Sequence, residues 1–315
     1  MSVGSIRNVS VVGAGLMGHG IAQEFLVAGY TVHLHDVSVE RLAAARENIR
    51  KNLLMLAGLG LAPPGAAESF PGLLTTTTDI REAVAEADIV IEAAFEDLEL
   101  KRDIFRSIDA LAPAHAILAS NSSSFMPGLM ASATRRPGNV LVAHYFNPPY
   151  LLPLVEIVRH EKTSDETVNT VCGLLKGLGK TPVVVRKESP GFIGNRLQAA
   201  LFREALSIVE HGIATPADVD TVIREGFGRR LGAAGVFEIW EIAGWDLILA
   251  ICENLFPTLE PRTTPAPTLK EMVARGELGV KSGRGFYEWT PESVSALKTR
   301  IATTLTEIAR VRRTG

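Results

Sequence analysis

The first part of the chain alternates short apolar runs with longer segments in which apolar residues recur every three or four positions. Short apolar runs bounded by turn residues are typical of buried strands, and the longer spacing is typical of amphipathic helices. The predicted strands are 8–12, 31–36, 87–92, 116–120, 140–144, 154–158 and 181–185. The most regular predicted helix carries Leu42, Ile49, Leu53 and Leu56 on one face. Apolar strands that alternate with helices predict a parallel sheet covered by helices on both faces.

The pattern changes near Lys187, and no strand-like run follows it. Ser189 and Pro190 are residue types preferred at the N-cap and the first helical position, so they predict the start of a helix. The apolar residues of this helix are Ile193, Leu197, Leu201, Ala205 and Ile208, before His211-Gly212 ends it. Thr215, followed three residues later by Asp218, predicts the start of the next helix. We therefore expect an α/β domain over 1–187 and an all-α domain over 188–315.

Composition and charge exclude several classes of protein. Of 315 residues, 46% are hydrophobic and 21% are charged, which are ordinary globular values. The formal net charge of −3 argues against a nucleic-acid footprint, which is basic. No apolar run reaches the roughly 18 to 20 residues that span a bilayer, and no apolar signal core precedes the first strand. The two cysteines, Cys172 and Cys252, lie in apolar helical segments and are expected to be buried thiols, not a disulfide or a metal site. We expect a cytoplasmic protein without nucleic-acid or membrane partners.

A dinucleotide fingerprint follows the first predicted strand. Gly13-x-Gly15-x-x-Gly18, with Leu16 and Met17 between the last two glycines, lies between a strand and a helix, which is the context that this motif requires. The pyrophosphate of a dinucleotide would lie at the helix N-terminus. Asp36 ends the second strand, where a carboxylate accepts from a ribose 2′-hydroxyl and repels a 2′-phosphate. The sequence therefore predicts NAD as the cofactor, and the alternative is a glycine-rich turn without a ligand.

Candidate chemistry follows two later strands. His144 closes one strand and Glu156 lies in the next, so the connecting loop can bring them side by side. A carboxylate behind one imidazole nitrogen orients the ring, which can then act as a base at neutral pH. The alternative is that His144 is an ordinary core or surface histidine. Residues 121–124 (Asn-Ser-Ser-Ser) offer hydroxyls to a substrate oxygen or form a polar turn, and Asn195 faces either a cleft or solvent.

The chain resembles the 3-hydroxyacyl-CoA dehydrogenase family, which includes 3-hydroxybutyryl-CoA dehydrogenases and the L-gulonate 3-dehydrogenases related to lambda-crystallin. The matching stretches, in family order, are VGAGLMG at 12–18, IEAAFEDLELK at 91–101, ASNSSS at 119–124, HYFNP at 144–148, LVE at 154–156, PGFIGNR at 190–196 and KSGRGFY at 281–287. The resemblance implies a Rossmann-type doubly wound, mostly parallel sheet followed by an all-α domain. It also implies a homodimer formed through the C-terminal domain.

The same resemblance implies roles for individual residues. His144 would be the base and Glu156 its orienting partner, while Ser123 and Asn195 would hydrogen-bond to the substrate oxygen. Asp36 would hold the adenosine ribose. The residues expected near the nicotinamide half of NAD are Glu96, Lys101 and Asn121.

The sequence leaves two classes of substrate open. We expect a short-chain L-3-hydroxyacyl-CoA that is oxidised to the 3-oxoacyl-CoA. Residues 52–80, however, contain no Lys or Arg, and a coenzyme A phosphate without a basic partner binds less tightly. The alternative substrate is therefore a free 3-hydroxy acid such as L-gulonate. A non-enzymatic, crystallin-like or NAD-sensing protein is the remaining alternative.

Overall fold

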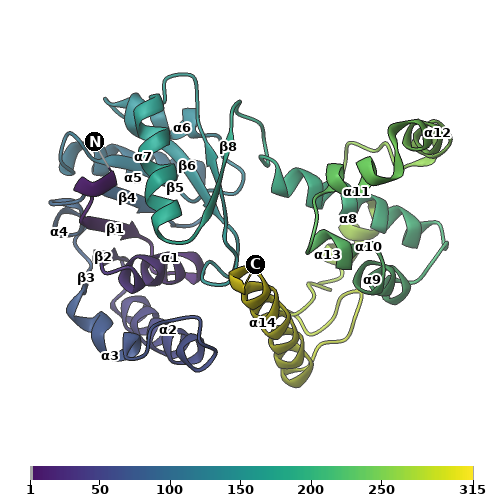
Figure 1. Cartoon of the computed structure of the whole chain (residues 1–315), viewed down its shortest axis with the longest axis horizontal. Helices are drawn as coiled ribbons and strands as arrows, with labels where there is room; N and C mark the ends of the chain where they lie inside the picture. Colours follow the sequence, from purple (N-terminus) through teal and green to yellow (C-terminus); the bar gives the residue numbers. More distant parts are fainter. Residues whose placement is uncertain (1–2, 315) are drawn as a thin grey trace. The chain divides into compact units, whose positions relative to one another are not determined.

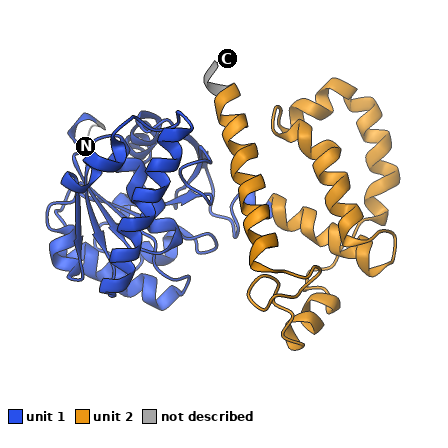
Figure 2. Cartoon of the chain, turned by 90° about the horizontal axis from the view of Figure 1, so that it is seen from below, with its two compact units in different colours: residues 1–196 blue, residues 197–315 orange. Residues whose placement is uncertain are grey.

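The structure is a computed structural model that describes residues 3–314. It forms two compact units, residues 1–196 and 197–315 (Figure 2). The first unit is an α/β layer structure and the second is helical (Figure 1). Within residues 3–314, no helix is both long and apolar enough to cross a membrane.

The first unit is built on one eight-stranded sheet with the order β3-β2-β1-β4-β5-β6-β7-β8. Its strands are β1 (Asn8–Val12), β2 (Thr31–His35), β3 (Leu74–Thr77), β4 (Ile89–Glu92), β5 (Ile117–Ser120), β6 (Val140–Tyr145), β7 (Leu154–Val158) and β8 (Thr181–Val185). All neighbouring strands are parallel except β6 and β7, which are antiparallel. The seven predicted strands are confirmed to within two residues at each end, and the edge strand β3 was not predicted.

Helices cover both faces of this sheet. They are α1 (Leu16–Val27), α2 (Val39–Gly58), α3 (Ala66–Ser69), α4 (Ile80–Val84), α5 (Leu98–Leu111), α6 (Pro127–Ala131) and α7 (Asp165–Gly177). Short 3₁₀ turns lie at Val3–Ser5, Phe70–Gly72 and Pro137–Asn139. The four apolar residues predicted on one face of α2 are all buried, which confirms that helix and its orientation.

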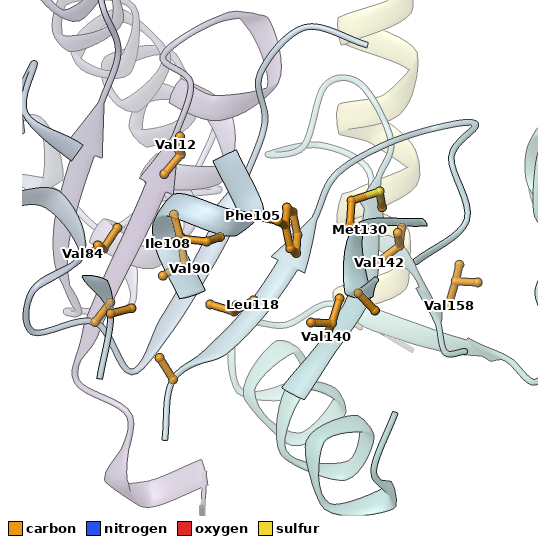
Figure 3. Packing of buried hydrophobic residues seen from close by; sticks show 14 of the residues in the cluster. Val12, Val84, Val90, Phe105, Ile108, Leu118, Met130, Val140, Val142 and Val158 are labelled. Atoms are coloured by element: carbon orange, nitrogen blue, oxygen red, sulfur yellow. The ribbon is translucent and has the colours of Figure 1, made fainter. Parts of the chain in front are cut away.

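Figure 3 shows the core between one face of the sheet and helices α4, α5 and α6. The strands contribute Val12, Val90, Leu118, Val140, Val142 and Val158. The helices contribute Val84, Phe105, Ile108 and Met130. Successive strand residues point to opposite faces, so Val11 and Ile91 are buried on the other face, where α1 and α7 pack. Burial on both faces explains why these strands are apolar runs without alternation.

The second unit consists of helices, and a long connection joins the last two of them. The helices are α8 (Gly194–Glu210), which begins in the first unit, α9 (Pro216–Glu225), α10 (Phe227–Leu231), α11 (Val236–Ala243), α12 (Trp245–Leu255), α13 (Pro267–Ala274) and α14 (Pro291–Thr314), with a 3₁₀ turn at Phe256–Thr258. Thr215 and Asp218 form the predicted capping box at the start of α9. Among the described residues beyond 187 there is no β-strand, and the only β-pairing consists of two isolated bridges, Gly279–Arg284 and Arg284–Glu288.

The helix start predicted at Ser189-Pro190 is wrong, because α8 begins at Gly194. Gly191 and Phe192 have φ values of 75° and 52°, in the left-handed region that a right-handed helix cannot contain. The Phe192 N–H instead donates to the Ser189 carbonyl in a tight turn. This turn places residues 188–196 with the first unit, and the domain boundary near Lys187 stays a prediction.

Candidate active site

His144 and Glu156 form a buried pair on neighbouring strands. They lie directly opposite each other in the antiparallel register of β6 and β7, so their side chains emerge on the same face. His144 Nδ1 lies 2.9 Å from Glu156 Oε2, and the two residues are only 5% and 1% exposed. A carboxylate accepts, so Nδ1 carries the hydrogen in this pair and Nε2 is the nitrogen with the free lone pair.

The second carboxylate oxygen of Glu156 is held by the turn that precedes α8. Glu156 Oε1 accepts from the backbone N–H groups of Ile193 at 3.0 Å and Gly194 at 2.9 Å. Burial acts to raise the Glu156 pKa, but the hydrogen bonds from His144 and from these two N–H groups outweigh it, and the pKa lies below its ordinary value. Glu156 is therefore an ionised and immobile partner for the imidazole.

Aromatic rings enclose the imidazole. The rings of Phe146 and Phe192 lie 4.7 Å and 5.6 Å from the His144 ring, centroid to centroid. Gly194 is required beside them, since a Cβ there would lie 2.5 Å from Phe146 Cζ. The turn at 191–194 thus supplies the N–H groups that donate to the Glu156 carboxylate, and it also supplies part of the apolar wall around His144.

The depressed pKa of Glu156 gives a pH dependence of stability. A carboxylate with a lowered folded-state pKa stabilises the fold fully above its unfolded value of 4.5, and this contribution disappears as pH falls through the folded value. We therefore expect the difference in free energy of unfolding between wild type and Glu156→Gln to shrink as the pH falls below 4.5. Urea unfolding of both proteins at several pH values measures this difference, and a difference independent of pH would contradict the assignment.

A second buried network lies at the ends of β4 and β5. Lys101 is 1% exposed, and its Nζ lies 2.8 Å from Glu92 Oε1 and 3.2 Å from Glu96 Oε2. Ser120 Oγ donates to Glu92 Oε2 at 2.6 Å. Ser122 Oγ donates to Glu96 Oε1 at 2.6 Å. Burial acts to raise the Glu96 pKa, but the serine hydroxyls and Lys101 outweigh it and hold the pKa below its ordinary value.

The sequence prediction included Glu96 and Lys101 but missed Glu92 and Ser120, and it considered Ser122 only as a contact to a substrate oxygen or as part of a polar turn. The available signal was a carboxylate that ends a buried strand, which requires a partner because an unpaired buried charge is costly. The same segment orders other predicted residues. Asn121 Oδ1 accepts from the Tyr145 N–H at 2.9 Å, which ties the end of β5 to the end of β6. The structure also brings Asn195 and Ser123 together, since Asn195 Nδ2 donates to the Ser123 carbonyl at 3.0 Å.

The glycine fingerprint forms a tight turn between β1 and α1. Gly13 has a φ of 106°, and a Cβ there would lie 2.6 Å from the Ala93 carbonyl oxygen. A Cβ at Gly18 would lie 1.7 Å from the Gly13 carbonyl oxygen. Beside Gly15 a Cβ would meet nothing within 4 Å, so the space in front of the helix N-terminus is open. Leu16 and Met17 form the first turn of α1, where unpaired N–H groups favour a phosphate.

Asp36 joins the fingerprint turn to the end of β2. Its carboxylate accepts from the Ala14 N–H at 2.9 Å and from the Ser38 N–H at 3.1 Å. The exposed Phe95 ring, in the loop that follows β4, has its centroid 4.9 Å from the Arg41 guanidinium carbon. Asp36 therefore lies at the carboxyl end of β2, on the edge of the sheet where open α/β sheets bind nucleotides. Across the described part of the chain, no group of three or more His, Cys, Asp or Glu residues is arranged to hold a metal ion.

Models of two domains from one protein family match this chain. A model of the 3-hydroxyacyl-CoA dehydrogenase NAD-binding domain matches residues 8–189, and a model of the C-terminal domain of the same family matches residues 191–289. A 5-formyl-3-hydroxy-2-methylpyridine 4-carboxylate 5-dehydrogenase from Mesorhizobium japonicum is 34% identical over 97% of this chain and 98% of its own length.

Two solved structures are similar over most of the chain. A crystal structure of a dehydrogenase for the same pyridine carboxylate, described as an NAD⁺-dependent dismutase, has a TM-score of 0.91 at 34% identity and covers 97% of this chain and 98% of that one. The structure of (S)-3-hydroxybutyryl-CoA dehydrogenase from Ralstonia eutropha has a TM-score of 0.76 at 36% identity and covers 91% of this chain and all of that one.

Proposed function

The chain belongs to the 3-hydroxyacyl-CoA dehydrogenase family, and from that premise we propose that it oxidises a hydroxyl group of a small substrate with His144 as the base. The enzyme is an NAD-dependent oxidoreductase of that family. The observation that carries the proposal is the 2.9 Å contact between His144 Nδ1 and Glu156 Oε2, which turns Nε2 into a hydrogen-bond acceptor.

The proposed chemistry needs one proton acceptor and one hydride acceptor. Bound NAD supplies the hydride acceptor. His144 Nε2 takes the hydroxyl proton, and the resulting imidazolium keeps its Nδ1 hydrogen bond to ionised Glu156. In the reductive direction His144 returns the same proton to the oxygen. Because Glu156 is fixed by two backbone N–H groups, the ring stays oriented throughout both steps.

We assign the remaining predicted residues to holding the oxygen and the cofactor. Ser123 and Asn195, already joined by a hydrogen bond, are proposed to donate to the substrate oxygen. The residues proposed to contact NAD are Gly13, Gly15, Leu16, Met17, Gly18, Asp36, Glu96, Lys101 and Asn121. The open space beside Gly15 and the carboxylate at the end of β2 support the pyrophosphate and ribose positions.

For the substrate, we place a free carboxylic acid ahead of the coenzyme A thioester. The segment that follows α2, residues 59–73, and the rest of 52–80 carry no Lys or Arg to hold a coenzyme A phosphate. The TM-score is 0.91 for the pyridine carboxylate dehydrogenase, against 0.76 for the 3-hydroxybutyryl-CoA dehydrogenase. The second candidate is a short-chain 3-hydroxyacyl-CoA, which the family membership favours.

A substrate panel tests this choice. We expect NADH formation from at least one free acid among L-3-hydroxybutyrate, L-gulonate and 5-formyl-3-hydroxy-2-methylpyridine 4-carboxylate, the last of which carries a hydroxyl at its reacting carbon only as the aldehyde hydrate. Its kcat/KM should exceed that for L-3-hydroxybutyryl-CoA by about tenfold or more, equivalent to about 1.4 kcal/mol, because the coenzyme A phosphates would lose their hydration without gaining a basic partner in residues 52–80. Turnover of the thioester alone would overturn the free-acid proposal and restore the acyl-CoA substrate.

We also propose a homodimer formed through the second unit. Its helices expose many large apolar side chains, more than a monomeric surface usually carries. The most exposed include Ile213, Phe237, Ile242, Leu249 and Phe256. Burying these side chains against a second copy is the simplest way to remove them from water.

A further inference from the structure

A buried ion pair lies outside the residues that family resemblance singles out. Lys180 precedes β8, and its Nζ pairs with the Glu24 carboxylate on α1. The two side chains are only 5% and 13% exposed. Lys180 Nζ also donates to the Pro149 carbonyl at 2.6 Å. One ammonium group thus joins α1, the start of β8 and the loop between β6 and β7.

The loop that Lys180 holds connects the two members of the His144–Glu156 pair. It leaves β6 directly after His144 and Tyr145, and it enters β7 two residues before Glu156. The N–H groups of residues 151 and 152 both donate to the Pro148 carbonyl, so the loop is a compact turn. A displacement of this turn would move both strand ends together with the imidazole.

The same loop rests on the helix that begins at the fingerprint. A Cβ added at Gly20 would lie 3.1 Å from both Cγ and Cδ of Pro149, so the absence of a side chain lets the proline ring approach α1 closely. Glu24 lies one helical turn further along α1 and reaches the loop through Lys180. One turn of α1 therefore lies directly against the loop that follows His144, and the next turn is joined to that loop through Lys180.

The charges in this cluster are costly to bury. Burial raises the pKa of Glu24, and the Lys180 ammonium opposes that rise. The Tyr145 ring is also buried nearby, and no described residue hydrogen-bonds to its hydroxyl. Buried ion pairs contribute little net stability compared with apolar residues of similar volume, so stability alone does not account for this one.

We propose that Glu24 and Lys180 are positioning residues that hold the loop at 147–151, and His144 with it, in register with the cofactor-binding helix α1. The proposal rests on the proposed function of His144. It follows from one ammonium group that contacts the α1 carboxylate and the loop carbonyl at the same time.

The decisive variant is the double substitution Glu24→Gln and Lys180→Met. It removes both buried charges together and keeps the side-chain volumes similar, so it avoids the uncompensated carboxylate that Lys180→Met alone would leave. Hydrogen–deuterium exchange of the peptide covering 145–152 should become at least about tenfold faster, because the loop loses its hydrogen bond. On the best substrate of the panel, kcat should fall by about 10- to 100-fold, the range expected when a reacting group moves by about an ångström.

Two further measurements and a control variant separate a positioning role from a structural role. The NAD dissociation constant, measured by titration calorimetry, should change less than about twofold, and the isotope effect with substrate deuterated at the reacting carbon should rise as hydride transfer becomes limiting. Lys176→Met, an exposed lysine on α7, is the matched control and should leave exchange and kcat unchanged. Unchanged exchange in the double variant would disprove the proposal that Glu24 and Lys180 hold the loop at 147–151. Faster exchange with wild-type kcat would disprove the positioning role. Neither outcome bears on whether His144 is the base, which its own substitution decides.

Discussion

Replacing His144 with asparagine should lower kcat by about 10²- to 10⁴-fold, the usual contribution of a positioned general base. Asparagine keeps a polar group near the Nδ1 position that can still donate to Glu156 at 2.9 Å, but it offers no basic nitrogen in place of Nε2. The residues proposed to contact NAD lie on α1, on α5 and on loops that follow β1, β2, β4 and β5, so the NAD dissociation constant should change less than about twofold. Stopped-flow NADH formation measures the first quantity and titration calorimetry the second.

Substitutions of Glu156, the partner of His144, and of His115, a histidine outside the pair, serve as the companion variant and the control for this test. Glu156→Gln should also lower kcat by orders of magnitude, because an amide can present the wrong group to Nδ1 and release the ring. Residues that act as a unit are not additive, so the double variant should be scarcely slower than His144→Asn alone. His115→Asn, on an exposed side chain beside Asp88, should match wild type. Wild-type kcat in His144→Asn would refute the base assignment.

Most of the sheet was predictable because strands that are buried on both faces have continuous apolar sequences. The edge strand β3 escaped prediction because Leu74 is its only large apolar residue, and the three threonines after it are not fully buried. An edge strand is covered less on its faces and needs no continuous apolar run. The helix start at Ser189-Pro190 was wrong for another reason. A preferred cap sequence cannot reveal that Gly191 and Phe192 adopt left-handed backbone conformations.

The candidate site was only partly readable from the sequence. His144 and Glu156 lie 12 residues apart on consecutive strands, so their contact needed only the antiparallel register of β6 and β7. The pair Glu24–Lys180 joins residues from distant strands and helices, and no local pattern marks it. The pair Glu92–Lys101 is intermediate in how far the sequence could predict it. Their spacing of nine residues is short, but only the structure shows that both are buried.

We expect Lys101→Met to destabilise the first unit by about 3 to 5 kcal/mol, the cost of removing one partner from a buried charge pair. Lys101 Nζ is the cation for both Glu92, which is fully buried, and Glu96. In the variant, Glu92 keeps the hydrogen bonds from Ser120 Oγ and the Ala94 N–H, and neither donor neutralises its charge. Urea unfolding followed by far-ultraviolet circular dichroism measures the loss.

Two companion variants show whether charge or packing causes that loss. Adding Glu92→Gln to Lys101→Met removes the unpaired carboxylate and should restore more than about 1 kcal/mol, because a neutral amide is far cheaper to bury than a carboxylate. Lys162→Met, on an exposed lysine, should stay within about 0.5 kcal/mol of wild type. If Lys101→Met lost less than about 1 kcal/mol, the network would hold its shape without an internal cation, and the assignment of Lys101 as the required charge partner would be wrong. A loss in the expected range, partly reversed by Glu92→Gln, means that this lysine is what permits two carboxylates to stand together at the edge of the sheet where the nicotinamide is proposed to bind.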